Sequence, residues 1–202
     1  MIRYVHIKSL VLNIYQQLPH IVFPIDLQEV INLIPNAKYM SYQDFAELNH
    51  CTINDIIQVC ESESGCTHYD VYSDRYLILC NQSTDNYNNL GRQQWTCAHE
   101  IGHILCKHHL ISAFDKLSEN SLLRVKNPEY ESEADYFAAT LLAPFPLFGL
   151  LNIESAYDIQ TVFGLSNEAS IYQYKHYKRW LQTRRKTAWE NDMIKLYKIK
   201  GE

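Results

Sequence analysis

The sequence predicts an α+β fold that is mainly helical, with a small β-sheet and a helical C-terminal segment. Much of the chain places apolar residues at helical spacing, three or four apart, and prolines divide these stretches from one another. One short region is instead rich in Tyr, Val, Ile and Leu on both sides of a turn. The 202 residues, 47% of them hydrophobic and 20% charged, suffice for a sizeable core.

The N-terminal part is expected to contain several short helices and one strand. Residues 1–18 carry apolar side chains at helical spacing, and this pattern ends just before a proline. A second helix begins at Asp26, an N-cap with a glutamate at the capping-box position, and a short strand follows at residues 37–40. Ser41 and Thr52 each precede an aspartate by three residues, which predicts two further helix starts.

A β-hairpin and two longer helices are expected in the centre of the chain. Residues 67–80 form the hairpin, with Ser73 and Asp74 as its turn, and a polar loop leads to a long helix at residues 92–110. Another helix, at residues 127–143, opens with Asn-Pro, in which the asparagine is a suitable N-cap and the proline suits the first helical position.

Two prolines mark the expected end of the first structural unit. Pro144 and Pro146 follow the helix at residues 127–143, so we divide the chain into residues 1–146 and a C-terminal helical segment, residues 147–202. Within this segment, residues 157–171 read as helix, glycine-containing turn and helix, which is the outline of a helix-turn-helix.

Cysteine usage, hydropathy and charge predict an ordinary cytoplasmic protein. The six cysteines include no Cys-x-x-Cys pair and are expected to be reduced thiols. No apolar stretch approaches the length of a membrane span, and the N-terminus lacks the cleavage site of a secretion signal. From Lys175 onward the chain has nine Lys or Arg and three acidic residues, a basic tail that suits nucleic acid or an acidic partner but is more often a solvated helix face.

The most informative stretch is His99-Glu100-x-x-His103, on the expected helix 92–110. Residues four apart share a helix face, so both imidazoles can reach one point in space. With His99 at zero on a helical wheel, His103 falls at about 40° and Glu100 at about 100°, whereas the apolar residues cluster between about 140° and 260°. This pattern indicates a Zn²⁺ site, with Glu100 placed to take a proton from water.

A catalytic zinc site needs a third protein ligand, and the helix at residues 127–143 offers three acidic candidates. On a wheel of this helix, Glu131 and Asp135 lie on the inner side, whereas Glu133 falls at about 200° from Glu131 and is expected to face water. We therefore expect Glu131 to be the third ligand, with Asp135 accepting the second ring N–H of a ligating histidine.

Three residues after the motif are further candidates for that ligand position. Cys106 lies one turn beyond His103 and is interpreted as a core residue. His108 and His109 point away from the metal side and are interpreted as histidines at a helix C-terminus.

The segments Thr96–His103 and Glu131–Pro144 resemble the ImmA/IrrE family of metallopeptidases. The expected strand at residues 75–81 is similar to the family's strand before the metal helix, and His108 fits a histidine often found in the family. The resemblance covers about residues 60–165 and matches the first 50 residues only loosely. It implies a zincin-like domain with a gluzincin-like site, in which His99, His103 and Glu131 hold zinc and Glu100 is the general base. Ala143 stands where the family usually has Met.

The same resemblance implies a zinc-dependent endopeptidase whose partner is a protein substrate. In the family that substrate is typically a repressor-type DNA-binding protein that controls a mobile element or a stress response. Two alternatives stay open: a regulatory module that binds DNA or a repressor without cutting it, and a protein whose zinc is structural. Direct DNA binding through residues 157–171 is the less favoured partner prediction, and no membrane partner is expected.

Overall fold

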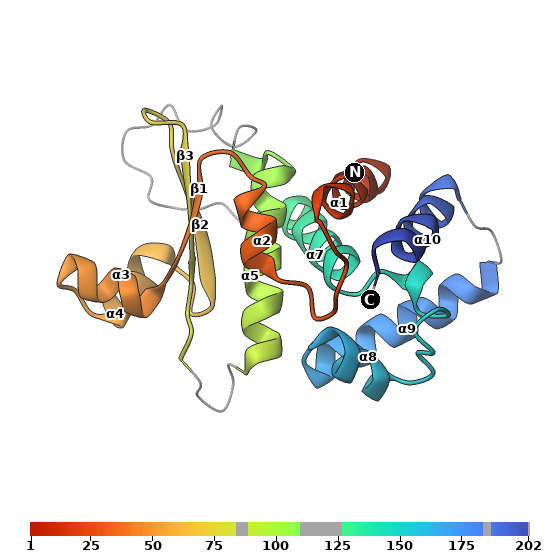
Figure 1. The fold of residues 1–202 in the computed structure, drawn as a ribbon. Helices are drawn as coiled ribbons and strands as arrows, with labels where there is room; N and C mark the ends of the chain where they lie inside the picture. Colours follow the sequence, from red (N-terminus) through yellow and green to blue (C-terminus); the bar gives the residue numbers. More distant parts are fainter. Residues whose placement is uncertain (84–88, 110–126, 184–186, 202) are drawn as a thin grey trace.

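The computed structural model describes residues 1–83, 89–109, 127–183 and 187–201 (Figure 1). It confirms an α+β fold in which helices predominate. A three-stranded sheet lies at one side of the molecule, with α3 (Tyr42–Asn49) and α4 (Ile53–Cys60) beyond it and α5 (Leu90–Leu105) on its opposite face. The predicted loop at residues 81–89 and the basic residues 184–186 lie partly or wholly outside the described residues.

The N-terminal helices start where their capping residues predict. α1 (Tyr4–Gln17) turns one apolar face into the core. Asp26 caps α2 (Leu27–Asn32), Ser41 caps α3, and Thr52 forms a capping box at α4. Each cap satisfies backbone N–H groups that the first helical turn leaves without partners inside the helix.

The sheet has the order β1-β3-β2, so that β2 is an edge strand. β1 (Ala37–Ser41) pairs with β3 (Arg75–Cys80) in parallel, and β2 (Gly65–Asp70) pairs with β3 in antiparallel orientation. The hairpin of β2 and β3 was expected, but β2 ends at Asp70, which makes the turn longer than the two residues predicted. β2 and β3 both pack against α5, which brings the sheet beside the His99–His103 motif.

α5 and α7 (Pro128–Leu142) form the central helix pair of the molecule. They approach closely at Gly102, where an added Cβ would lie 3.2 Å from Ala134 Cα and 3.1 Å from Phe137 Cδ1. A larger side chain here would separate the two helices. α5 ends at Leu105, earlier than predicted, because Lys107 has a left-handed backbone with φ of 59°; residue 110 lies outside the described residues.

The C-terminal segment contributes to the same core as the rest of the chain. A short 3₁₀ helix, Phe145–Leu147, leads to α8 (Ala156–Phe163), α9 (Asn167–Thr183) and α10 (Ala188–Lys200). Gly164, with φ of 67°, ends α8, and α8 and α9 pack as the predicted helix-turn-helix outline. One hydrophobic cluster joins Phe163 and Met193 to Ile7 and Ile101. The division at residue 146 stays a prediction, but the core continues across it.

Two further properties of the described residues concern the hydropathy of the helices and the pairing of the cysteines. None of the helices in these ranges combines the length and apolar character that a membrane crossing requires. The structure pairs Cys60 with Cys66 as a disulfide, whereas we expected only reduced thiols. Cys97 and Cys106 are buried, as predicted for residues on or next to the motif helix.

Candidate metal centre

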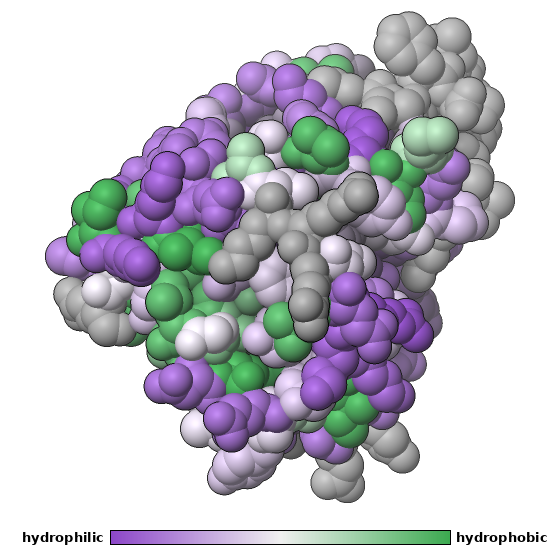
Figure 2. Space-filling view, turned by 90° about the vertical axis from the view of Figure 1, so that its right-hand side faces the viewer, coloured by the Kyte–Doolittle hydropathy of each residue, from purple (hydrophilic) through white to green (hydrophobic). Residues whose placement is uncertain are grey.

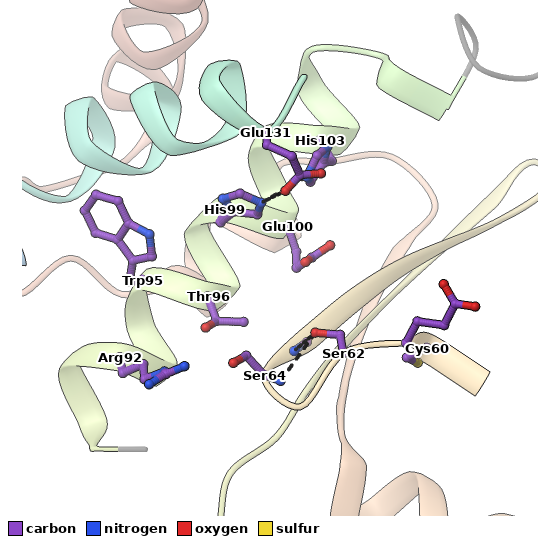
Figure 3. Close-up of a pocket in the computed structure, with 12 residues that line it drawn as sticks. Cys60, Ser62, Ser64, Arg92, Trp95, Thr96, His99, Glu100, His103 and Glu131 are labelled. Carbon is purple, nitrogen blue, oxygen red and sulfur yellow. Dashed lines mark hydrogen bonds and ion pairs between the residues drawn. The ribbon is translucent and has the colours of Figure 1, made fainter. Parts of the chain in front are cut away.

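Three side chains from α5 and α7 turn their donor atoms toward one another (Figure 3). His99 Nε2 and His103 Nε2 lie 3.0 Å apart, as the spacing of four residues on one helix predicts. Glu131, from the first turn of α7, places one carboxylate oxygen 3.3 Å from His99 Nε2 and the other 3.6 Å from His103 Nε2. The predicted triad is therefore brought together.

The geometry and chemistry of this donor set fit a zinc ion. Two ligands about 2.1 Å from a metal at a tetrahedral angle are separated by about 3.4 Å, because zinc–nitrogen and zinc–oxygen bonds are about 2.0–2.2 Å long. The two ring nitrogens lie 3.0 Å apart, and they lie 3.3 and 3.6 Å from one or the other Glu131 oxygen, which are separations around that value. Two imidazoles and one carboxylate would leave the fourth position for water or substrate, as catalytic zinc requires.

Glu100 lies beside the triad on the side that faces β2. Its side chain is buried with 5% of the residue exposed, and Thr67 Oγ1 donates a 2.7 Å hydrogen bond to Glu100 Oε2. Thr67 stands on the edge strand, so the sheet holds this carboxylate in place. We did not identify Thr67 from the sequence, because nothing local indicates which residue of the hairpin meets α5.

Asp135 contacts His99 as predicted. Its Oδ1 lies 2.9 Å from His99 Nδ1, one turn along α7 from Glu131. Burial lowers the pKa of His99, but hydrogen bonds to Asp135 and Glu131 outweigh burial and raise the pKa to about 9. The same carboxylates that favour a protonated imidazole would favour a metal cation at its Nε2.

The prediction that Glu133 faces water is wrong. Glu133 is 2% exposed and receives Arg3 hydrogen bonds at 3.0 Å or less, from both the side chain and the backbone N–H. Burial alone would raise the pKa of Glu133, yet Arg3 and His108 lower it to about 2. The prediction from the helical wheel assumed that the face of α7 opposite α5 is exposed to solvent. In the structure, the start of α1 covers this face.

His108 is also not the peripheral residue that we expected. It is 4% exposed, and its Nδ1 lies 2.8 Å from His103 Nδ1. Its other ring nitrogen lies 3.0 Å from Glu133 Oε2. The chain turns back after α5 at Lys107, which a straight continuation of the helix did not anticipate. His109, by contrast, lies against Tyr76, 2.8 Å from its hydroxyl.

Cys106, His108 and Glu133 form a second group whose donor atoms are close enough for a metal. Arg3 argues against that use, because its guanidinium already pairs with both oxygens of Glu133 and donates to the Cys106 carbonyl at 3.0 Å. Burial raises the pKa of the Cys106 thiol to about 11, which disfavours the thiolate that a metal needs. The group is better described as a buried hydrogen-bonded cluster.

The triad opens into a cleft of about 290 Å³. α5 contributes Arg92, Trp95 and Thr96 to one wall, and Ser62 and Ser64 line the opposite wall (Figure 3). No tyrosine is among the described residues that line this cleft.

A second cavity, of about 540 Å³, adjoins the first between α1, α7, α9 and α10. Trp95 lines both, and the second one is rich in aromatic side chains, including Tyr136, Tyr172, Trp180 and Trp189. Figure 2 shows the side of the molecule on which these C-terminal helices lie, where hydrophobic residues gather in one area among hydrophilic ones. The sequence did not predict this cavity.

Comparison with known proteins identifies the family of this site. A family model, described as the IrrE N-terminal-like domain, matches residues 57–174. No curated protein matches significantly. The matched region includes the three members of the triad, Glu100 and Asp135, whereas Arg3 lies outside it. Because the match covers more than half of the chain, this protein belongs to the IrrE N-terminal-like family of peptidases.

Proposed function

We propose that this chain is a zinc-dependent endopeptidase. The observation that carries the proposal is the triad: two imidazole nitrogens and a carboxylate separated by 3.0 to 3.6 Å, with the Glu100 carboxylate beside them. Membership of a peptidase family supports it. His99, His103 and Glu131 would hold the ion, and Glu100 would be the general base.

Zinc in such a site supplies a Lewis acid that polarises a carbonyl and lowers the pKa of water. Glu100 would take the proton from the attacking water and deliver it to the leaving amine. Thr67 would fix the Glu100 carboxylate through the 2.7 Å hydrogen bond, and Asp135 would fix the ring of His99. The walls of the cleft would exclude part of the solvent and orient the scissile peptide.

We further propose that the substrate is a repressor-type DNA-binding protein. The support is the resemblance of the two metal-site segments to ImmA/IrrE peptidases, together with the second cavity, which shares the lining residue Trp95 with the cleft at the triad. A polypeptide could occupy both, with its scissile bond at the triad and an apolar side chain in the adjoining cavity.

The test is co-expression with the repressor encoded beside this protein, using the wild type and Glu100→Gln. Glu100→Gln removes the base but keeps all three ligands, so it should retain zinc, measured by elemental analysis, and produce no repressor fragment. Thr96→Ser, in the same cleft, is the control that should still cleave. Fragment production by Glu100→Gln at the wild-type rate would overturn the mechanism.

A binding module without cleavage is the second candidate, favoured by the basic residues Lys175, Lys178 and Arg179 on α9. It predicts that the whole chain binds duplex DNA with an affinity that falls steeply with salt. A repressor that is bound by the wild type and never cut would favour this function over peptidase activity.

A further inference from the structure

A chain of hydrogen-bonding groups extends from His103 to the start of the protein. His103 Nδ1 lies 2.8 Å from His108 Nδ1, and His108 Nε2 lies 3.0 Å from Glu133 Oε2. Arg3 completes the chain, because its Nε lies 3.0 Å from each oxygen of Glu133. The four residues come from α5, the helical residues that follow the turn at Cys106 and Lys107, α7, and the residue before α1.

The acid–base character of the end groups sets the direction of every hydrogen bond. Arg3 only donates, so ionised Glu133 only accepts. His108 must then carry its proton on Nε2 to donate to Glu133, which leaves Nδ1 as an acceptor. His103 in turn must donate from Nδ1, which leaves its Nε2 unprotonated, and an unprotonated Nε2 can bind a metal through its lone pair. That lone pair points at the position between His99 and Glu131.

We propose that Arg3, Glu133 and His108 are positioning residues that fix the tautomer and the ring orientation of His103 for metal binding. The inference rests on the proposed metal site and deepens it. None of the three contributes a ligand to the triad. They act through His103, as Asp135 acts through His99.

The two histidines are supported in different ways. His99 relies on a single carboxylate, that of Asp135, whose side chain is 58% exposed. His103 relies on groups that are almost fully buried, since the His108 and Glu133 side chains are 5% and 3% exposed. The Glu133 carboxylate is buried, so the loss of Arg3 or His108 would leave its charge less compensated, and this second support is costly to break.

The role of Arg3 could not have been carried over from the family match, which starts at residue 57. Arg3 also donates from its backbone N–H to Glu133 at 2.7 Å, which fixes the position where α1 begins. Through Arg3, the N-terminal part of the chain therefore contributes to the support of the metal site.

The experiment separates hydrogen bonding at His108 from packing. His108 stacks on Tyr130 with ring centroids 4.6 Å apart and an interplanar angle of 9°. His108→Phe keeps an aromatic ring for this stacking but removes both hydrogen bonds. His108→Asn restores an acceptor near the Nδ1 position and loses the stacking. His109→Asn, at the neighbouring histidine against Tyr76, is the control.

Zinc affinity is measured on the full chain by competition with a chromophoric chelator, and Co²⁺ substitution gives a ligand-field spectrum of the site. His108→Phe should weaken zinc binding by about 10- to 100-fold and change the Co²⁺ spectrum. His108→Asn should recover most of the affinity, and His109→Asn should match the wild type. Arg3→Met should weaken binding less than His108→Phe, and the double variant should not be weaker than His108→Phe alone.

The outcomes separate this inference from the proposed function. A wild type that binds zinc at the triad together with a His108→Phe variant of equal affinity would refute the positioning role alone. A wild type that does not bind zinc would remove both proposals. If His108→Phe does not fold, as judged by circular dichroism, the zinc affinities of Arg3→Met and His108→Asn are compared with that of the wild type. A zinc affinity of Arg3→Met equal to that of the wild type would then overturn the positioning role.

Discussion

The hydroxyl of Thr67, on the edge strand, donates a hydrogen bond of 2.7 Å to the Glu100 carboxylate beside the metal triad. This contact joins the sheet to the helix that carries both histidines. It predicts that Thr67→Val, which is similar in size but has no hydroxyl, lowers kcat/KM by roughly 10- to 100-fold, because a hydrogen bond to a charged group contributes about 1.5–3 kcal/mol. Peptide-cleavage kinetics and zinc content are measured together. Thr67→Ser should retain most activity; equal rates for the Val and Ser variants would refute the role of the hydroxyl.

Asp135→Asn tests the support of His99. Asn keeps the size and can still accept through its amide oxygen, but it removes the negative charge 2.9 Å from His99 Nδ1. We expect zinc affinity or activity to fall by about 10- to 100-fold. Ser132→Ala, on the exposed face of the same helix, is the control. Wild-type zinc affinity and activity in Asp135→Asn would show that the carboxylate has no such role.

Removal of zinc should abolish activity and leave the protein folded. The α5–α7 contact buries Ala98, Ile101, Phe137 and Ala138 completely, without any contribution from the metal ligands. Zinc at one hundred times its Kd would add only about 2.7 kcal/mol to the free energy of unfolding. Circular dichroism after dialysis against a chelator measures this. Loss of the helical signal at 25 °C would instead indicate a structural zinc.

The surroundings of Glu190 predict that the contact between α10 and α1 is sensitive to acid. Burial raises the pKa of Glu190, but hydrogen bonds from Thr187 and the ion pair with Lys8, at 3.3 Å, lower it below its ordinary value of 4.5. A lowered pKa in the folded state gives stability that is complete above the ordinary value and is lost as pH falls below it. Urea unfolding at pH 7 and pH 4 should show this loss in the wild type.

Glu190→Gln should lower the free energy of unfolding at pH 7 by about 1–3 kcal/mol and reduce its dependence on pH. Asp192→Asn, at an exposed position of the same helix, should change it by less than about 0.5 kcal/mol. An unchanged pH dependence in Glu190→Gln would mean that other carboxylates cause the acid sensitivity.

Gly102→Ala tests the close approach of the two ligand-bearing helices. In an exposed helix this change stabilises by about 1 kcal/mol. Here the new Cβ would lie 3.2 Å from Ala134 Cα, so we expect no gain in stability and weaker zinc binding, since Glu131 would move away from His99. Gly149→Ala is the control, because nothing lies within 4 Å of its Cβ position. Thermal unfolding and zinc titration check both effects.

The triad was predictable because its geometry is local. His99 and His103 share a face of one helix, and the phase of a second helix separated Glu131 from Glu133 correctly with respect to the metal side. The N-caps Asp26, Ser41, Thr52 and Asn127 were likewise found from residues within one turn.

Contacts between distant segments were not predictable. Arg3 and Glu133 are 130 positions apart, and no pattern on α7 reveals that α1 begins against its second face. A helical wheel gives the direction in which a side chain points, but it does not show which segment of the chain covers that face of the helix. For this reason Glu133 was predicted to face water. Thr67 was missed for the same reason, since its partner depends on which strand forms the edge beside α5.

The packing of α1 has a consequence for the order in which the protein matures. α1 is synthesised before α7 and α10, yet these two helices cover its apolar face, which carries Ile7 and Val11. Trp189, near the start of α10, donates a 2.7 Å hydrogen bond to the Lys8 carbonyl and so completes this enclosure. During synthesis the apolar face of α1 must therefore stay exposed, or be held by a chaperone, until α10 has emerged from the ribosome. The proposed peptidase activity should accordingly arise only after α10 has been translated.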